Sequence, residues 1–113
     1  MAATGNALAL AGPESRKLYA SLLEALQSVG PFEIEVKKTS IHLVRKSAFA
    51  GVAPRKQYLL LTIKASEPIE SSRIFKSEQA SKHRWHLETR IASAEEIDAE
   101  LLGWLRESYE ISA

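Results

Sequence analysis

The chain has 113 residues, of which 45% are hydrophobic and 26% are charged, and its formal net charge is +1. This length suits one domain with a single core, and this composition is typical of globular proteins rather than of disordered or fibrous ones. The absence of cysteine excludes disulfides, thiolate nucleophiles and cysteine-ligated zinc, and the longest apolar run, Tyr58 to Leu61, is far shorter than the ~20 residues of a membrane-spanning helix.

The first twelve residues are small, apolar or neutral, and without periodicity. We expect residues 1–12 to be a disordered leader and residues 13–113 to be a single α+β domain. The leader also lacks the basic and continuously apolar segments of a signal peptide, so we expect a cytoplasmic protein.

A helix is predicted from Pro13 onward, because proline is well tolerated in the first helical turn. Hydrophobic residues then recur at helical spacing until Gly30-Pro31 ends the pattern. They are Leu18, Leu22, Ala25, Leu26 and Val29, which would form the buried stripe of one amphipathic helix.

After Pro31 the hydrophobic period changes to two, which predicts a strand with Phe32, Ile34 and Val36 on its buried face. Three β-rich runs follow, over residues 40–45, 48–53 and 57–65. The turns between them are short, so we expect antiparallel neighbours in a meander.

Residues 67–81 show no sustained period, and we interpret them as a polar connection that Ile74 and Phe75 hold to the core. A fifth strand over residues 84–91 follows. It places one alternating set on the buried face: Trp85, Leu87, Thr89 and Ile91.

Ser93 and Glu96 have the spacing of a capping box, which predicts the start of a second helix. Its interior contains Gly103, which costs about 1 kcal/mol relative to alanine and therefore indicates close packing against another element. The buried stripe of this helix comprises Ile97, Leu101, Trp104, Leu105 and Ser108. We interpret Trp85 and Trp104 as core residues rather than as stacking platforms.

The predicted fold class is α+β, with the element order α-β-β-β-β-β-α. An antiparallel five-stranded meander sheet, flanked on one face by the N- and C-terminal helices, would bury all of these stripes together.

The residues give little indication of catalysis, and we expect no enzyme, no catalytic residue, no cofactor and no metal site. There is no nucleophile elbow and no glycine-rich phosphate loop. His83 and His86 are three residues apart, but on a strand they would point to opposite faces, and further zinc ligands are lacking. An enzymatic function would need a pocket with converging polar groups around His42, His83 or His86.

The small net charge conceals a segregation along the chain. Residues 37–90 carry 12 basic and 4 acidic side chains, whereas residues 91–113 carry 1 and 6. The acidic residues near the second helix are explained by capping, by complementarity to the helix dipole and by an ordinary solvated face. The basic segment therefore predicts a binding surface for an anionic partner.

The basic residues of this segment concentrate in the predicted turns. Lys37 and Lys38 belong to the first turn and Arg55 and Lys56 to the third, and alternate turns of a meander lie at the same end of a sheet. Basic hairpin turns can grip a phosphate backbone.

The second turn, with Arg45 and Lys46, would lie at the opposite end. Solvated turns are often charged for no functional reason, and lysines at sheet edges also discourage aggregation. From the clustering of the basic turns we nevertheless expect a non-catalytic domain that binds a polyanion, namely a nucleic acid such as DNA, through these turns. The alternative is a protein–protein interaction module or a homodimer, in which the basic sheet meets the acidic helix around Glu95, Glu100 and Glu107.

Two long stretches carry a resemblance, VKKTSIHLVRKSAFAGVAPRKQYLLLTIKAS and SKHRWHLETRIASAEEIDAELLGWLRESYEIS. Over residues 15–112 the chain resembles a bacterial domain of unknown function, which is found alone or appended to predicted transport or restriction-nuclease-like proteins. This resemblance implies an α+β sandwich and supplies no reaction.

The last third of the chain is also similar to MmcQ/YjbR-like proteins, through Lys82, Trp85 and the acidic helix that ends in Ser108-Tyr109-Glu110. That likeness implies a frataxin-like fold and a double wing that binds DNA. Frataxins use acidic residues of their first helix for iron, and here that helix offers only Glu14 and Glu24, so we expect no iron delivery.

Overall fold

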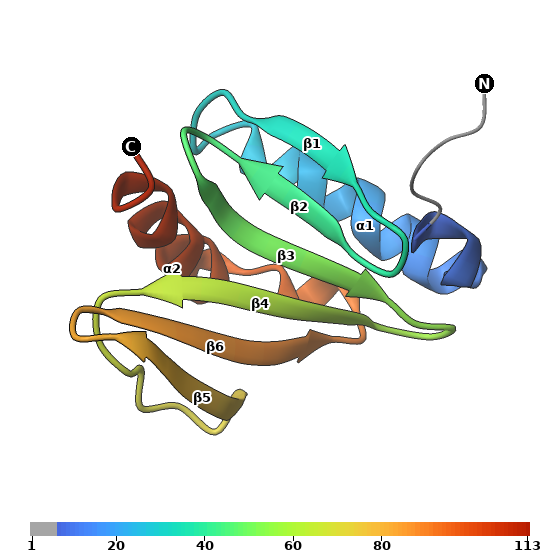
Figure 1. The fold of residues 1–113 in the computed structure, drawn as a ribbon. Helices are drawn as coiled ribbons and strands as arrows, with labels where there is room; N and C mark the ends of the chain where they lie inside the picture. Colours follow the sequence, from blue (N-terminus) through green and yellow to red (C-terminus); the bar gives the residue numbers. More distant parts are fainter. Residues whose placement is uncertain (1–6) are drawn as a thin grey trace.

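The computed structural model describes residues 7–113, which form two layers, one antiparallel sheet and two α-helices that lie against the same face of it (Figure 1). The helices are α1 (Pro13–Leu26) and α2 (Ala99–Glu110), with two short 3-10 helices, η1 (Ala7–Leu10) and η2 (Ala94–Glu96). The strands are β1 (Glu33–Val36), β2 (Ile41–Val44), β3 (Ala48–Pro54), β4 (Leu59–Ala65), β5 (Ile74–Ser81) and β6 (Arg84–Ile91). Within residues 7–113, no helix covers the second face of the sheet.

The sheet has six strands in the order β1-β2-β3-β4-β6-β5, and each neighbouring pair is antiparallel. The α+β class is confirmed, but the prediction of a five-stranded meander is wrong, because β5 is a sixth strand and β6 separates it from β4. The inner position belongs to β6 because its residues Leu87, Thr89 and Ile91 are buried under the helices.

The connection predicted for residues 67–81 contains the missed strand. Seven of the eight residues of β5 are exposed, and its pairing with β6 is interrupted by two irregularities. Phe75 is 46% exposed. A solvated edge strand has no need of alternating hydrophobic residues, so β5 leaves no period-two signal in the sequence.

The first strand is also more exposed than its pattern predicts. Ile34 is 45% exposed, and only Val36 of β1 is partly buried. β1 is the other edge of the sheet, and three of its four residues are exposed. The alternation thus predicts the strand correctly but overstates its burial.

The N-terminal segment next to α1 packs on the domain. The amide of Ala7 donates to the carbonyl of Lys37 at 3.1 Å, and Ala7 is fully buried. A Cβ at Gly12 would collide with the carbonyl oxygen of Lys56. Of the leader predicted over residues 1–12, residues 7–12 therefore lie against the sheet end, and the remainder is outside the described residues.

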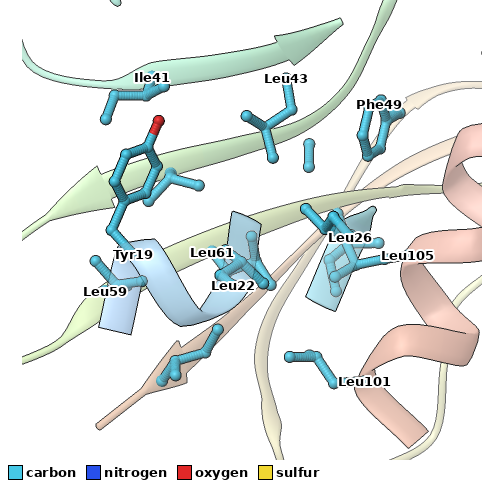
Figure 2. Packing of buried hydrophobic residues seen from close by; sticks show 14 of the residues in the cluster. Tyr19, Leu22, Leu26, Ile41, Leu43, Phe49, Leu59, Leu61, Leu101 and Leu105 are labelled. Atoms are coloured by element: carbon cyan, nitrogen blue, oxygen red, sulfur yellow. The ribbon is translucent and has the colours of Figure 1, made fainter. Parts of the chain in front are cut away.

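The core lies between the sheet and the two helices. Figure 2 shows Leu22 and Leu26 of α1 and Leu101 and Leu105 of α2 pointing toward the same group of strand residues. Burying one such side chain contributes about 1.5–3 kcal/mol, so this layer is the main source of stability. The fully buried strand residues are Ile41, Leu43, Phe49, Val52, Leu59, Leu61, Ile63, Leu87 and Ile91.

The second helix begins later than predicted. The carboxylate of Glu96 accepts from the amides of Ala92 (2.6 Å) and Ser93 (3.0 Å), but this arrangement opens the 3-10 turn η2. The backbone of Ile97 then leaves the helical region, and α2 starts with Asp98 as its N-cap. The capping signal is correct locally, yet the helix that follows it is only one turn long.

Gly103 is not the close-packing residue that the sequence indicates. A Cβ at this position of α2 would meet no atom within 4 Å. Replacing Gly103 with alanine is therefore expected to raise the free energy of unfolding by about 0.5–1 kcal/mol, because alanine loses less backbone entropy in a helix. Urea unfolding of the two proteins measures this, and a loss of stability would show that the glycine is required.

Candidate functional site

Two of the three basic turns lie at one end of the sheet. The β1–β2 turn carries Lys37 and Lys38, and the β3–β4 turn carries Arg55 and Lys56. Figure 1 shows both turns at the end where α1 begins, whereas the β2–β3 turn is at the other end. All four residues are exposed. The predicted juxtaposition of these turns is thus present, and we call the four side chains the basic end.

The backbone beneath the basic end is anchored to the N-terminal part of the chain. The hydroxyl of Ser15, in α1, donates to the carbonyls of Arg55 (2.5 Å) and Tyr58 (3.2 Å), and Ser15 is fully buried. The β1–β2 turn is held by its bond from Ala7 to Lys37. Both turns are therefore fixed relative to each other while their charged side chains project into solvent.

The four cations differ in their surroundings. Lys37 forms an ion pair with Glu35 at 3.5 Å, with both side chains about half exposed. Among the described residues, no ion pair or hydrogen bond involves the side chains of Lys38, Arg55 or Lys56. These three groups are the ones most available to an anionic partner.

Arg45 is occupied by the fold. Its guanidinium donates to the carbonyl of Tyr109 at 3.0 Å and lies 4.2 Å from the centre of that ring. Arg84 donates to the carbonyl of Ile111 at 3.4 Å. Cations are favourable at a helix C-terminus, where carbonyls lack helical partners. Arg45 thus stabilises the end of α2, a contact between residues 64 positions apart that the sequence could not reveal.

Lys46 remains exposed in the β2–β3 turn. The amides of Lys46 and Ser47 both donate to the carbonyl of Ser112 at 3.3 Å, which ties this turn to the chain after α2. The structure therefore divides the six predicted site residues into two groups. Four form the basic end, and the other two, Arg45 and Lys46, lie in the turn at the opposite end, where Arg45 has a structural role.

His83 and His86 belong to different surroundings. His83 lies in the exposed β5–β6 turn, and His86 lies on the open face of β6. In residues 7–113, no three histidine, aspartate or glutamate side chains come together in a way that could hold a metal ion.

A shallow hollow of about 270 Å³ lies on the open face of the sheet. Its floor is formed by β3, whose open face carries only Ala48, Gly51 and Ala53. A bulge places Phe49 and Ala50 together on the buried face and so leaves this floor without a large side chain. The sequence pattern does not predict the hollow, because a bulge breaks the period of two.

Polar side chains from three strands border the hollow. They are His42 from β2, Thr62 and Lys64 from β4, and His86 from β6. His42 and Thr62 both pair with Gly51, and Lys64 pairs with His86. This is the pocket with converging polar groups whose presence the sequence left open.

Lys64 is partly withdrawn from solvent. Its ammonium donates to the hydroxyl of Ser47 at 2.9 Å. Burial, together with the positive charge of Arg84, lowers the pKa of Lys64 below its usual value of 10.5. An anion placed beside this group would offset both effects, because opposite charge favours the protonated amine.

A second polar cluster fixes the start of α2. Arg73 donates to both carboxylate oxygens of Asp98 (3.0 and 3.1 Å), to Glu100 (3.0 Å) and to the carbonyl of Glu96 (2.6 Å). The Asp98 carboxylate also accepts from the amide of Leu101 at 3.0 Å. The bond from Leu101 and the pairing with Arg73 lower the pKa of Asp98 below its usual 3.8.

The lowered pKa of Asp98 makes the stability of the fold dependent on pH. A carboxyl group with a lowered folded-state pKa stabilises the fold above its unfolded-state pKa and loses that contribution as pH falls through the folded-state pKa. The urea midpoint is thus expected to fall below about pH 4. In the Asp98→Asn variant, which keeps an N-cap acceptor but cannot titrate, this fall should be smaller. Identical pH profiles for the two proteins would contradict this role.

None of the helices in residues 7–113 combines the length and apolar character needed to cross a membrane. No curated protein and no solved structure matches the chain. A family model does match, over residues 7–112, and that span includes the N-terminal segment as well as both helices and all six strands. The chain therefore belongs to the family described as Domain of unknown function (DUF5655).

Proposed function

We propose that this domain is a non-catalytic, cytoplasmic nucleic-acid-binding module whose basic end contacts the phosphate backbone. The observation that carries the proposal is the juxtaposition of two anchored turns (Figure 1) with four exposed cations, three of them without an ion pair in the described residues. Backbone phosphates are contacted mainly by lysine and arginine side chains, whose position must be fixed for the duplex to be held in one register.

The likeness to MmcQ/YjbR-like proteins supports the same proposal. Those proteins have been suggested to bind DNA through a double wing, and here two neighbouring turns would act as the wings. The third turn contributes less, because Arg45 is engaged with the end of α2. We therefore assign the contact to Lys37, Lys38, Arg55 and Lys56 and leave Arg45 and Lys46 outside it.

Salt dependence tests the proposal. Neutralising four phosphates predicts that the logarithm of affinity for duplex DNA falls with the logarithm of salt concentration at a slope of about −3.6. Replacing all four residues with glutamine should remove most of this slope. Lys46→Gln with Lys82→Gln, two exposed lysines in turns at the other end, is the matched control and should leave the slope unchanged. Absence of binding at low salt, or equal slopes for both variants, would overturn the proposal.

Sedimentation at two ionic strengths addresses the competing hypothesis of self-association. The exposed acids of the second helix region, such as Glu95 and Glu107, could meet the basic end of another copy. A dimer that dissociates as salt rises, in a protein that does not bind DNA, would favour that hypothesis and reject nucleic-acid binding.

A further inference from the structure

The hollow on the open face lies apart from the basic end and has a different chemistry. Its floor is flat at the level of side chains, since Ala48, Gly51 and Ala53 project nothing larger than a methyl group. His42 and Thr62 stand on the strands to either side, so their Cα atoms are about 10 Å apart, two strand spacings. A planar group can lie on such a floor between these two side chains.

The polar groups at the border favour an anion. Lys64 and His86 are cross-strand neighbours at one end of the hollow, and the ammonium of Lys64 is already oriented by Ser47. None of the residues that line the hollow is acidic. An anionic group there would therefore meet a lysine and a histidine without a competing carboxylate in the lining.

Carboxylates are present only beyond the border. Glu35 pairs with His42, Glu88 with Thr62 and Glu78 with His86, each across the next strand boundary. Lys76 lies 3.8 Å from Glu88 and partly neutralises it. These groups would disfavour a ligand with several negative charges that extends past the hollow. They are compatible with one small anionic group held inside it.

We propose that this hollow binds a small molecule with a planar apolar body and a single anionic group, either a carboxylate or a phosphate. The body lies on Gly51 and its alanine neighbours, and the anion is held by Lys64 and His86. Concave sites with an apolar lining and a few convergent polar groups are the usual form of small-molecule sites.

Two variants test the two halves of this site. Gly51→Val should fill the floor without disturbing the strand, because a Cβ there would touch only Cβ of Thr62, at 3.8 Å, and the φ angle of Gly51 is not positive. Lys64→Met keeps the apolar stem of the side chain and removes the charge. Lys56→Gln, at the basic end, is the matched control.

The experiment is an NMR titration of the ¹⁵N-labelled protein, in which binding is monitored through the backbone amide chemical shifts. The probes are phenyl phosphate, benzoate, inorganic phosphate and benzyl alcohol. We expect phenyl phosphate or benzoate to give saturable shifts at Gly51, Thr62 and Lys64 with a Kd of about 1 mM or below. Inorganic phosphate and benzyl alcohol should bind at least tenfold more weakly, since each lacks one half of the recognised structure.

Which of the two aromatic acids binds more tightly distinguishes a phosphate from a carboxylate ligand. Gly51→Val and Lys64→Met should each weaken binding at least tenfold, and Lys56→Gln should not change it. The proposal is overturned if neither acid gives saturable shifts at these residues, or if Gly51→Val, folded by its amide spectrum, binds like the native protein. DNA binding depends on the basic end, so either result is independent of the proposed function.

Discussion

Replacing Phe49 with alanine is expected to lower the free energy of unfolding by about 3–5 kcal/mol, the usual cost of removing a fully buried aromatic side chain. Phe49 is 0% exposed and lies in the bulge of β3. The free energy of unfolding of small domains is only about 5–15 kcal/mol, so this substitution would remove a large part of the stability.

The position of Phe49 explains the size of the effect. Its ring packs edge-on against Phe32, with centres 5.7 Å apart, and against Tyr109, with centres 5.2 Å apart. Tyr109 in turn donates its hydroxyl to the carbonyl of Pro31 at 2.6 Å. One ring thus joins the segment before β1, strand β3 and the last turn of α2.

Urea unfolding provides the measurement, with two further variants. Phe49→Leu retains most of the volume and should cost less than Phe49→Ala. Phe75→Ala is the matched control, because Phe75 is 46% exposed and its ring stacks on Arg90, 4.4 Å from its centre, at the surface. Equal losses of stability in Phe49→Ala and Phe75→Ala would contradict the prediction. The buried ring in the edge-on cluster would then contribute no more to stability than a half-exposed phenylalanine at the surface.

The elements that the sequence predicts well are those with one buried face. α1 begins at Pro13 as expected, and β6 buries Leu87, Thr89 and Ile91 on one face while His86 and Glu88 lie on the other. These patterns exist because each element must cover the core with one side. β5 is solvated on both sides, so the same reasoning has nothing to detect there.

The two candidate sites also differ in how far the sequence predicts them. The basic end follows from chain order alone, because alternate turns of antiparallel neighbours share an end. The hollow depends on the bulge at Phe49, and the role of Arg45 depends on where α2 ends. Both features depend on contacts between segments that are far apart in the sequence, and such contacts cannot be predicted from hydrophobic periodicity or motif spacing.

Replacing Ser108 with alanine is expected to lower the free energy of unfolding by about 2–6 kcal/mol, because two backbone groups lose a partner at about 1–3 kcal/mol each. The Ser108 hydroxyl, fully buried, donates to the carbonyl of Phe49 at 2.5 Å and accepts from the amide of Lys64 at 2.9 Å. The ladder between β3 and β4 ends at Ala50 and Ile63, one pair short of these two residues. The hydroxyl thus takes the place of the next ladder bond and fastens α2 to both strands.

Ser112→Ala is the matched control, because Ser112 is equally buried but its hydroxyl donates only to the carbonyl of Ser108, at 2.9 Å, within the end of α2. It should cost about 1 kcal/mol, the usual net value of one hydrogen bond. In Ser108→Ala, hydrogen exchange at the amide of Lys64 should also accelerate relative to that at Ile63, whose residue remains paired in the ladder. Equal stability of the two serine variants, with unchanged exchange at the Lys64 amide, would contradict this role. Strands β3 and β4 would then form the next ladder hydrogen bond directly, without the Ser108 hydroxyl.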